Sequence, residues 1–87
     1  MYFVYILHST HIDRYYIGHT SDIQIRIERH NNGSSRFTAR AADWELVYQE
    51  EYVTKGEAMK RENDLIHRYT RHIKKLLMRF ALDKWKF

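Results

Sequence analysis

The N-terminal part of the chain carries two apolar segments separated by polar residues. Residues 2–7 are aromatic or aliphatic throughout, which is typical of a strand buried in a sheet. Residues 15–19 form a second segment of this kind after a polar connection. Because the connection is short, we expect the two strands to pair as an antiparallel hairpin.

A helix is predicted after this hairpin. Ser21 is suitably placed as its N-cap, and Asp22 falls in the first turn, where a negative charge is favourable. Ile23 and Ile27 then share one helical stripe. The isoleucine between them also fits the alternation of a strand, which stays open as an alternative. The Asn-Asn-Gly run at residues 31–33 ends the helix, since Asn and Gly tolerate the left-handed conformation.

The second half of the chain predicts a third strand followed by helix. After a loop at residues 34–43, residues 44–53 alternate between apolar and polar side chains. Thr54 and Glu57 match a capping box at the start of a helix. Apolar residues continue at helical spacing to Tyr69, and a further stripe at residues 73–80 suggests a break near Thr70 and another helix. The predicted order is β-β-α-β-α-α: an α/β (α+β) fold with a small, mainly antiparallel, three-stranded sheet flanked by helices.

Length, composition and charge limit the classes of protein. A chain of 87 residues predicts one domain, residues 1–87. The absence of cysteine excludes thiol catalysis, disulfides and cysteine zinc sites, and favours a cytoplasmic location. The apolar start is too short to span a membrane. A net charge of +4 and a pI near 9.5 favour a polyanionic partner such as nucleic acid.

One acidic residue falls on a helix stripe that should face the sheet. Glu62 lies four residues after Ala58 and three before Leu65, both of which are apolar. A carboxylate in that position must be paired or must bind a cation. An internal salt bridge, for example to Arg26, and a metal site are both open at this point.

Two further pairs of residues have side chains that can bind an anion or transfer a proton. Arg26 and His30 are four residues apart and should emerge on one helix face. Tyr5 and Tyr16 have positions that can place both rings on one face of the hairpin. Taken alone, the first pair fits a solvated basic face and the second fits core aromatics.

In combination these residues resemble the motifs of the GIY-YIG nuclease superfamily. Residues 3–5 (Phe-Val-Tyr) and 16–18 (Tyr-Ile-Gly) are similar to its paired motif, with Phe in the place of the first Gly. Arg26 and His30 match its helix arginine and a recurrent histidine, and residues 57–62 (Glu-Ala-Met-Lys-Arg-Glu) resemble its E-A-x-x-x-E stretch. His19 departs from the residues that are common after the glycine. The resemblance covers residues 2 to about 77 and is closest to small stand-alone members.

The resemblance implies metal-dependent hydrolysis of DNA phosphodiester bonds, with DNA repair or recombination as its setting. Glu62 would hold one divalent ion, Mg²⁺ or Mn²⁺, and Arg26 would grip the scissile phosphate. Tyr5 is favoured as the base that accepts a proton from water, its pKa lowered by Arg26 and the metal. Tyr16 and His30 would relay that proton or orient the water. Gly18 would allow a tight strand exit close to the phosphate.

Several basic side chains around these motifs are candidate contacts to nucleic acid: Arg29, Arg36, Arg40, Lys60 and Arg61. A non-catalytic nucleic-acid-binding module would also explain the charge and the aromatic residues. A degenerate nuclease fold that now binds another protein is a second alternative. Neither alternative requires a metal at Glu62.

Overall fold

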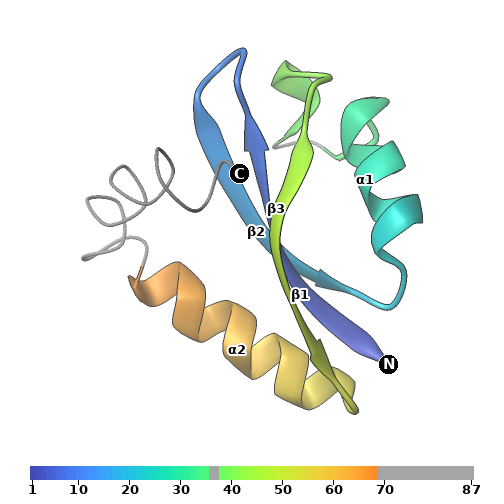
Figure 1. The fold of residues 1–87 in the computed structure, drawn as a ribbon, viewed down its shortest axis with the longest axis vertical. Coiled ribbons are helices and arrows are strands. Elements are labelled where there is room, and N and C mark those ends of the chain that lie inside the picture. Colours follow the sequence, from blue (N-terminus) through green and yellow to red (C-terminus); the bar gives the residue numbers. More distant parts are fainter. Residues whose placement is uncertain (36–37, 69–87) are drawn as a thin grey trace.

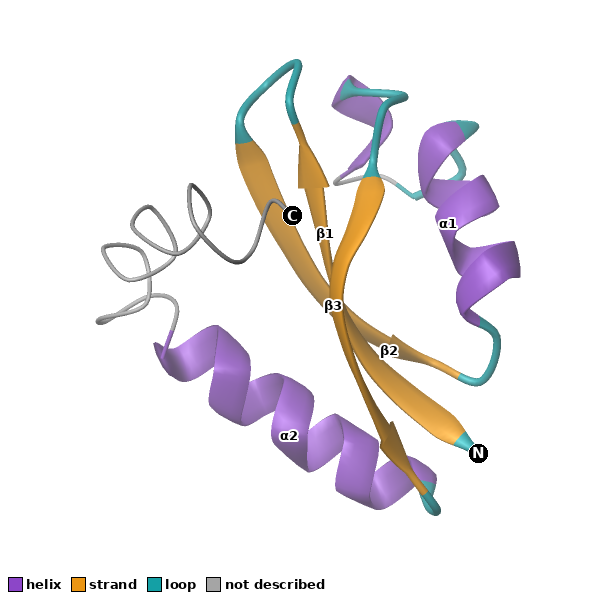
Figure 2. Ribbon diagram, viewed as in Figure 1, coloured by secondary structure: helices purple, strands orange, loops and turns teal. Residues whose placement is uncertain are grey.

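The described residues form a three-stranded antiparallel sheet with a helix against each face (Figures 1 and 2). The computed structural model describes residues 1–35 and 38–68. The predicted helix at residues 73–80 and the break near Thr70 lie outside the described residues. The elements in chain order are β1 (Tyr2–Ser9), β2 (Arg14–Thr20), α1 (Ile23–Asn31), the 3-10 helix η1 (Thr38–Arg40), β3 (Glu45–Tyr52) and α2 (Lys55–Arg68).

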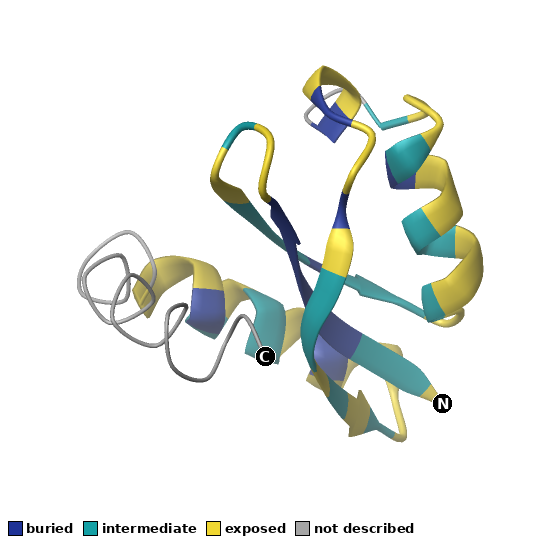
Figure 3. Cartoon of the chain, turned by 45° about the horizontal axis from the view of Figure 1, so that its top comes forward, coloured by how far each residue is buried: buried dark blue, intermediate teal, exposed yellow. Residues whose placement is uncertain are grey.

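The strand β1 occupies the centre of the sheet, and β2 and β3 pair with it on either side. The hairpin predicted from the first two apolar segments is confirmed, with Tyr5 opposite Gly18 and Leu7 opposite Tyr16. The predicted third strand is confirmed as β3, antiparallel to β1. Figure 3 shows the buried positions concentrated along the central strand. Since β2 lies at the edge of the sheet, groups from both faces can meet beside it.

Alternate residues of β1 pack into two separate apolar clusters. Tyr5 and Leu7 face α1 and cluster with Trp44. Val4 faces the other side and packs against Ala58 and Leu65 of α2. This arrangement follows from the two-residue period of a strand, which sends successive side chains to opposite faces. The two helices therefore cover opposite faces of the sheet, as Figure 1 shows.

The helix α1 begins at Ile23, one residue later than the predicted N-cap, Ser21, would place it. Asp22 is the N-cap, and its Oδ1 accepts a hydrogen bond from the backbone N–H of Ile25 at 3.1 Å. The prediction of Ser21 as N-cap is wrong, because Asp22 is the last extended residue, with φ −146° and ψ 103°. The side chain of Ile25 is 49% exposed, whereas Ile23 and Ile27 pack on the core, so the helical interpretation of this segment is correct.

The other predicted helix signals are confirmed. Gly33 has φ +82°, the left-handed conformation expected after the end of α1. At the start of α2, the Glu57 N–H donates to Thr54 Oγ1 at 3.2 Å, and the Thr54 N–H donates to Glu57 Oε1 at 3.1 Å. These reciprocal bonds are those of a capping box.

No helix among the described residues is long and apolar enough to cross a membrane. The apolar start of the chain forms β1 and lies within the sheet.

Replacing Asp22 by Ala should lower the free energy of unfolding by about 1 kcal/mol, because the N–H of Ile25 loses its acceptor. Urea unfolding followed by tryptophan fluorescence measures this change. Ser21→Ala is the matched control, and we expect it to change stability by less than about 0.5 kcal/mol. Equal losses in the two variants would contradict the assignment of Asp22 as the cap.

Candidate active site

The two motif tyrosines meet over Gly18, in the middle of β2. Their ring centroids are 6.2 Å apart. A Cβ atom at Gly18 would lie 2.7 Å from Tyr5 Oη and 3.0 Å from Tyr16 Cε2, closer than side chains tolerate. The prediction that Gly18 provides a tight strand exit is therefore wrong, since β2 continues to Thr20. Gly18 instead leaves the space that the Tyr5 hydroxyl occupies.

A buried chain of hydrogen bonds links the first tyrosine to α1 and η1. Tyr5 Oη lies 2.9 Å from His30 Nε2, and His30 Nδ1 lies 2.6 Å from Thr38 Oγ1. The backbone carbonyl of Thr38 accepts a bond of 2.9 Å from Trp44 Nε1. All four side chains are at most 2% exposed. The chain therefore fixes β1, α1, η1 and the start of β3 relative to one another.

Burial keeps His30 neutral. Burial and the nearby Arg26 guanidinium together lower the pKa of His30 to about 4. A neutral imidazole can accept the Tyr5 hydroxyl proton at Nε2 while donating from Nδ1 to Thr38, and we assign this tautomer from the network. The interpretation of His30 as part of a solvated basic face is wrong, since it points inward from α1 and is 1% exposed.

Burial raises the pKa values of Tyr5 and Tyr16, whereas the resemblance led us to expect a lowered pKa for Tyr5. Burial, followed by the neighbouring Tyr16, raises the pKa of Tyr5, and Arg26 lowers it by a smaller amount. Without a bound cation, the expected net lowering of the Tyr5 pKa by Arg26 is therefore absent. Burial and then the Glu62 carboxylate raise the pKa of Tyr16, and Arg26 again opposes them.

Glu62 lies on the opposite face of the sheet from these tyrosines and is ion-paired with His19 of β2. Its side chain is 20% exposed and that of His19 is 27% exposed, so both are largely buried but still in partial contact with solvent. The partner of Glu62 is His19 rather than Arg26, and a metal site at Glu62 stays a prediction. His19 reaches Glu62 because residues 17 and 19 of β2 face α2, whereas Gly18 faces α1.

Charged groups from both faces of the sheet act on the tyrosine hydroxyls beside the edge strand β2. The negative charge of Glu62 and the positive charge of Arg26 both act on the hydroxyl of Tyr16 and on that of Tyr5. The two phenols lie against Gly18, and Glu62 contacts the next residue of β2, His19, from the other face. Arg26 of α1 is near enough to act on the pKa values of both phenols. This set provides a carboxylate for a cation, a cation for a phosphate oxygen, and hydroxyls that can move a proton.

The donors present fit a divalent ion that keeps most of its waters. Among the described residues, no three His, Asp or Glu side chains group together as metal ligands. Glu62 supplies one solvent-accessible carboxylate, which is the oxygen donor that Mg²⁺ and Mn²⁺ accept. An ion bound there must share that carboxylate with His19 or replace it as the partner.

The candidate nucleic-acid contacts fall into different environments. Arg61 donates to Glu50 at 2.8 and 3.1 Å and to Asp64 at 2.8 Å, so its guanidinium is held within the protein. The bonds from Arg61, followed by those from two tyrosines of β3, lower the pKa of Glu50 to about 2. Arg40 and Lys60 are exposed on η1 and α2. Arg36 lies outside the described residues.

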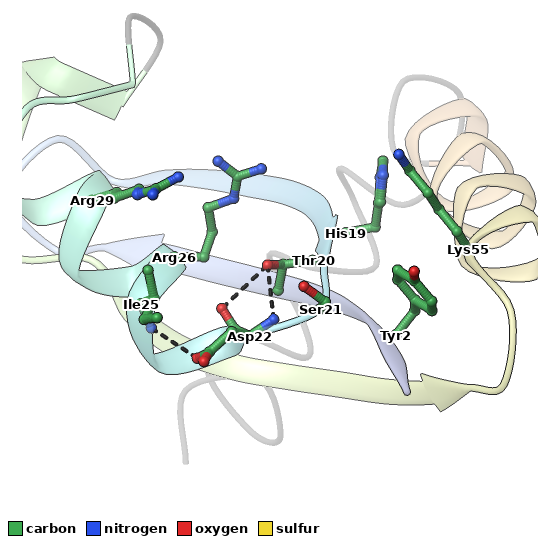
Figure 4. A pocket seen from close by; sticks show the side chains of 9 residues that line it. All are labelled: Tyr2, His19, Thr20, Ser21, Asp22, Ile25, Arg26, Arg29 and Lys55. Carbon is green, nitrogen blue, oxygen red and sulfur yellow. Dashed lines mark hydrogen bonds between the residues drawn. The ribbon is translucent and has the colours of Figure 1, made fainter.

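Arg29 belongs to a cavity of about 360 Å³ next to Arg26 (Figure 4). This cavity opens between the start of α1, the end of β2 and the start of α2. Its lining residues are Tyr2, His19, Thr20, Ser21, Asp22, Ile25, Arg26, Arg29 and Lys55.

Two residues of the site were not assigned a role from the sequence. Thr38 falls within the loop that the sequence predicts at residues 34–43, and nothing in its spacing from His30 indicates that the two side chains bond. In the sequence, His19 stands out only as a departure from the residues that are common after the glycine. Its position two residues after Ile17 was the available signal, because that parity places it on the face opposite Gly18.

Comparisons with known proteins give one consistent result. A family model described as the GIY-YIG catalytic domain matches residues 1–76. A UPF0213 protein of Staphylococcus epidermidis is 43% identical over 74 residues, covering 84% of this chain and 88% of that protein. A UPF0213 protein of Staphylococcus aureus is 40% identical over 79 residues, covering 90% and 94% of the two chains. The solution NMR structure of the UPF0213 protein BH0048 from Bacillus halodurans is 30% identical with a TM-score of 0.53, covering 97% of this chain and 87% of that one.

Lowering the pH should destabilise the protein through His30. Its folded-state pKa of about 4 lies below the ordinary value of 6.5, so the unfolded chain takes up the proton first as the pH falls. The contribution of this residue to the free energy of unfolding should decrease by up to roughly 3 kcal/mol between about pH 7 and about pH 4. Urea titrations at a series of pH values measure the slope.

His30→Gln provides the comparison, because its side-chain amide does not titrate. We expect the variant to show a flatter dependence on pH over that interval than the wild-type protein. Identical slopes in the two proteins would mean that His30 is not held neutral by the fold.

Proposed function

The chain belongs to the GIY-YIG family, and from that premise we propose that it is a metal-dependent endonuclease that hydrolyses phosphodiester bonds of DNA. DNA repair or recombination is the setting that we propose for this activity. Residues 1–87 are proposed to act as one nuclease domain. The observation that carries the proposal is that Tyr5 and Tyr16 lie together against Gly18, while Glu62 contacts the next residue of the edge strand β2, His19.

We assign the metal to Glu62, whose side chain is partly exposed to solvent. The ion is proposed to be Mg²⁺ or Mn²⁺, and when bound it would act as a Lewis acid on the phosphate and the leaving oxygen. Arg26 would bind a non-bridging phosphate oxygen, where its charge counts most in the transition state. This assignment gives a cation-binding role to a carboxylate whose partner among the described residues is the imidazole of His19.

The buried hydrogen-bond chain supports a role for Tyr5 as the proton acceptor. Its hydroxyl donates to His30 Nε2, which leaves the oxygen lone pairs free to accept a proton from water. As that proton arrives, the original phenolic proton can pass to His30, so that no free phenolate is needed. This relay avoids the Tyr5 phenolate that burial disfavours, and it requires a transient positive charge on His30, which burial and Arg26 oppose. Tyr16, which is only half-buried, would orient the water or the phosphate.

A non-catalytic module on the same fold is the alternative function. It would use the basic surface, including Arg29, Arg40 and Lys60, to hold nucleic acid or would bind another protein. The buried Tyr5–His30 pair would then serve only as structure. The alternative predicts no divalent-ion binding at Glu62 and no cleavage of DNA by either the wild-type protein or a Glu62 variant.

Glu62→Gln should remove the ion and reduce cleavage by at least about 100-fold, because an amide is a much weaker ligand than a carboxylate. Binding is measured as the loss of the free Mn²⁺ signal in electron paramagnetic resonance, and cleavage on linear, nicked and branched DNA. Glu51→Gln, at an exposed position of β3, makes the same change of charge and should leave both unchanged. Wild-type Mn²⁺ binding by Glu62→Gln would refute the assignment.

Tyr5→Phe should reduce cleavage by about 100-fold or more, the contribution typical of a general base. It should also lower the free energy of unfolding by about 1–2 kcal/mol, since buried His30 loses a partner. Tyr48→Phe is the control, because it removes a hydroxyl that bonds to Glu50 away from the site. Full cleavage by a folded Tyr5→Phe protein would show that Tyr5 is a core residue alone.

A further inference from the structure

The cavity beside Arg26 collects positive charge from three elements. Arg26 and Arg29 come from neighbouring turns of α1, and Lys55 is the first residue of α2. Figure 4 shows both arginine side chains extending from α1 to the same side, with His19 and Lys55 across the cavity from them. The cavity therefore has permanent cations on two opposite walls.

These cations are not neutralised within the part of the chain that the structure describes. Across residues 1–35 and 38–68, Arg26, Arg29 and Lys55 form no ion pair with a carboxylate. The acid that lines the cavity is Asp22, and its Oδ1 already accepts the N–H that caps α1. By contrast, Arg61 has carboxylates of two acids as partners.

Like charges gathered around one cavity repel one another, and an anion bound between them removes that cost. The volume of about 360 Å³ falls within the range of roughly 300–1,000 Å³ typical of small-ligand sites. Tyr2 adds an aromatic ring to the wall, which suits the face of a base. The lining therefore combines phosphate-binding cations with a stacking surface.

We propose that this cavity binds one nucleotide of a DNA strand, adjacent to the phosphate that is cleaved. Arg29 and Lys55 hold its phosphate, and its base stacks on Tyr2. The inference rests on the proposed nuclease function, because Arg26 and His19 connect the cavity to the site: Arg26 acts on the tyrosine hydroxyls, and His19 pairs with Glu62. It adds Lys55 and Tyr2 as substrate-binding residues.

The test measures binding without metal, so that hydrolysis plays no part. A short fluorescein-labelled single-stranded DNA is titrated in EDTA by anisotropy at several salt concentrations. Arg29→Gln and Lys55→Gln should each weaken binding by about tenfold and reduce the steepness of log K against log salt by up to about 0.7, the value for complete loss of one phosphate contact. Arg14→Gln, at the other end of β2, makes the same change of charge and should change binding less than about twofold.

The base-stacking part has its own variant. Tyr2→Leu keeps an apolar side chain, so it should weaken binding of the DNA strand by about fivefold or more without changing the salt slope. Competition by thymidine 5′-monophosphate that exceeds competition by inorganic phosphate supports a nucleotide site. Equal competition by the two would reduce the site to a phosphate site and overturn the nucleotide assignment.

Equal weakening by Arg14→Gln and Lys55→Gln would show diffuse electrostatic attraction and would overturn the cavity as a site. These outcomes are independent of cleavage. A protein that binds as expected but never hydrolyses DNA would contradict the proposed nuclease function and leave the cavity assignment intact. If the protein cleaves DNA while Arg29→Gln and Lys55→Gln bind DNA normally, the nuclease function stands and the cavity assignment is overturned.

Discussion

The buried chain of hydrogen bonds from Tyr5 through His30 to Thr38 is the constraint on which the candidate site depends. It links the sheet to α1 through buried side chains, and the carbonyl of Thr38 extends it to Trp44, the residue before β3. Each member is buried, so each must find its partner inside the protein. The chain fixes the rotation of α1 about its axis, and Arg26 lies one turn before His30 on the same helix.

Because β2 lies at the edge of the sheet, residues from its two faces can contribute to one site. In a central strand, neighbouring strands would separate Glu62 from the tyrosines. At the edge, the missing side chain of Gly18 gives the Tyr5 hydroxyl its space, while His19 turns to the other face and holds the carboxylate of Glu62. The site is thus assembled around one strand by the alternation of its side chains.

The distribution of charge separates arginines that stabilise the fold from those available to a ligand. Arg61 was predicted to contact nucleic acid because the sequence shows only that it is basic and next to Glu62. In the structure it donates two hydrogen bonds to Glu50, whose carboxylate also accepts from the hydroxyl of Tyr52. Arg26 and Arg29 have no such carboxylate among the described residues, and they line the cavity instead. Sequence spacing cannot distinguish these cases, because the partner acid comes from β3.

The sequence by itself determined the local structure and the set of reactive side chains. The strand segments, the capping box at Thr54 and the end of α1 near Gly33 follow from preferences that act within a few residues. The motif residues were found because their order and spacing are visible along the chain. Tertiary structure alone decided that His30 is neutral and inward, that Gly18 makes room for a hydroxyl, and that Glu62 pairs with His19. Those outcomes depend on burial and on contacts between residues far apart in sequence, which a linear pattern does not encode.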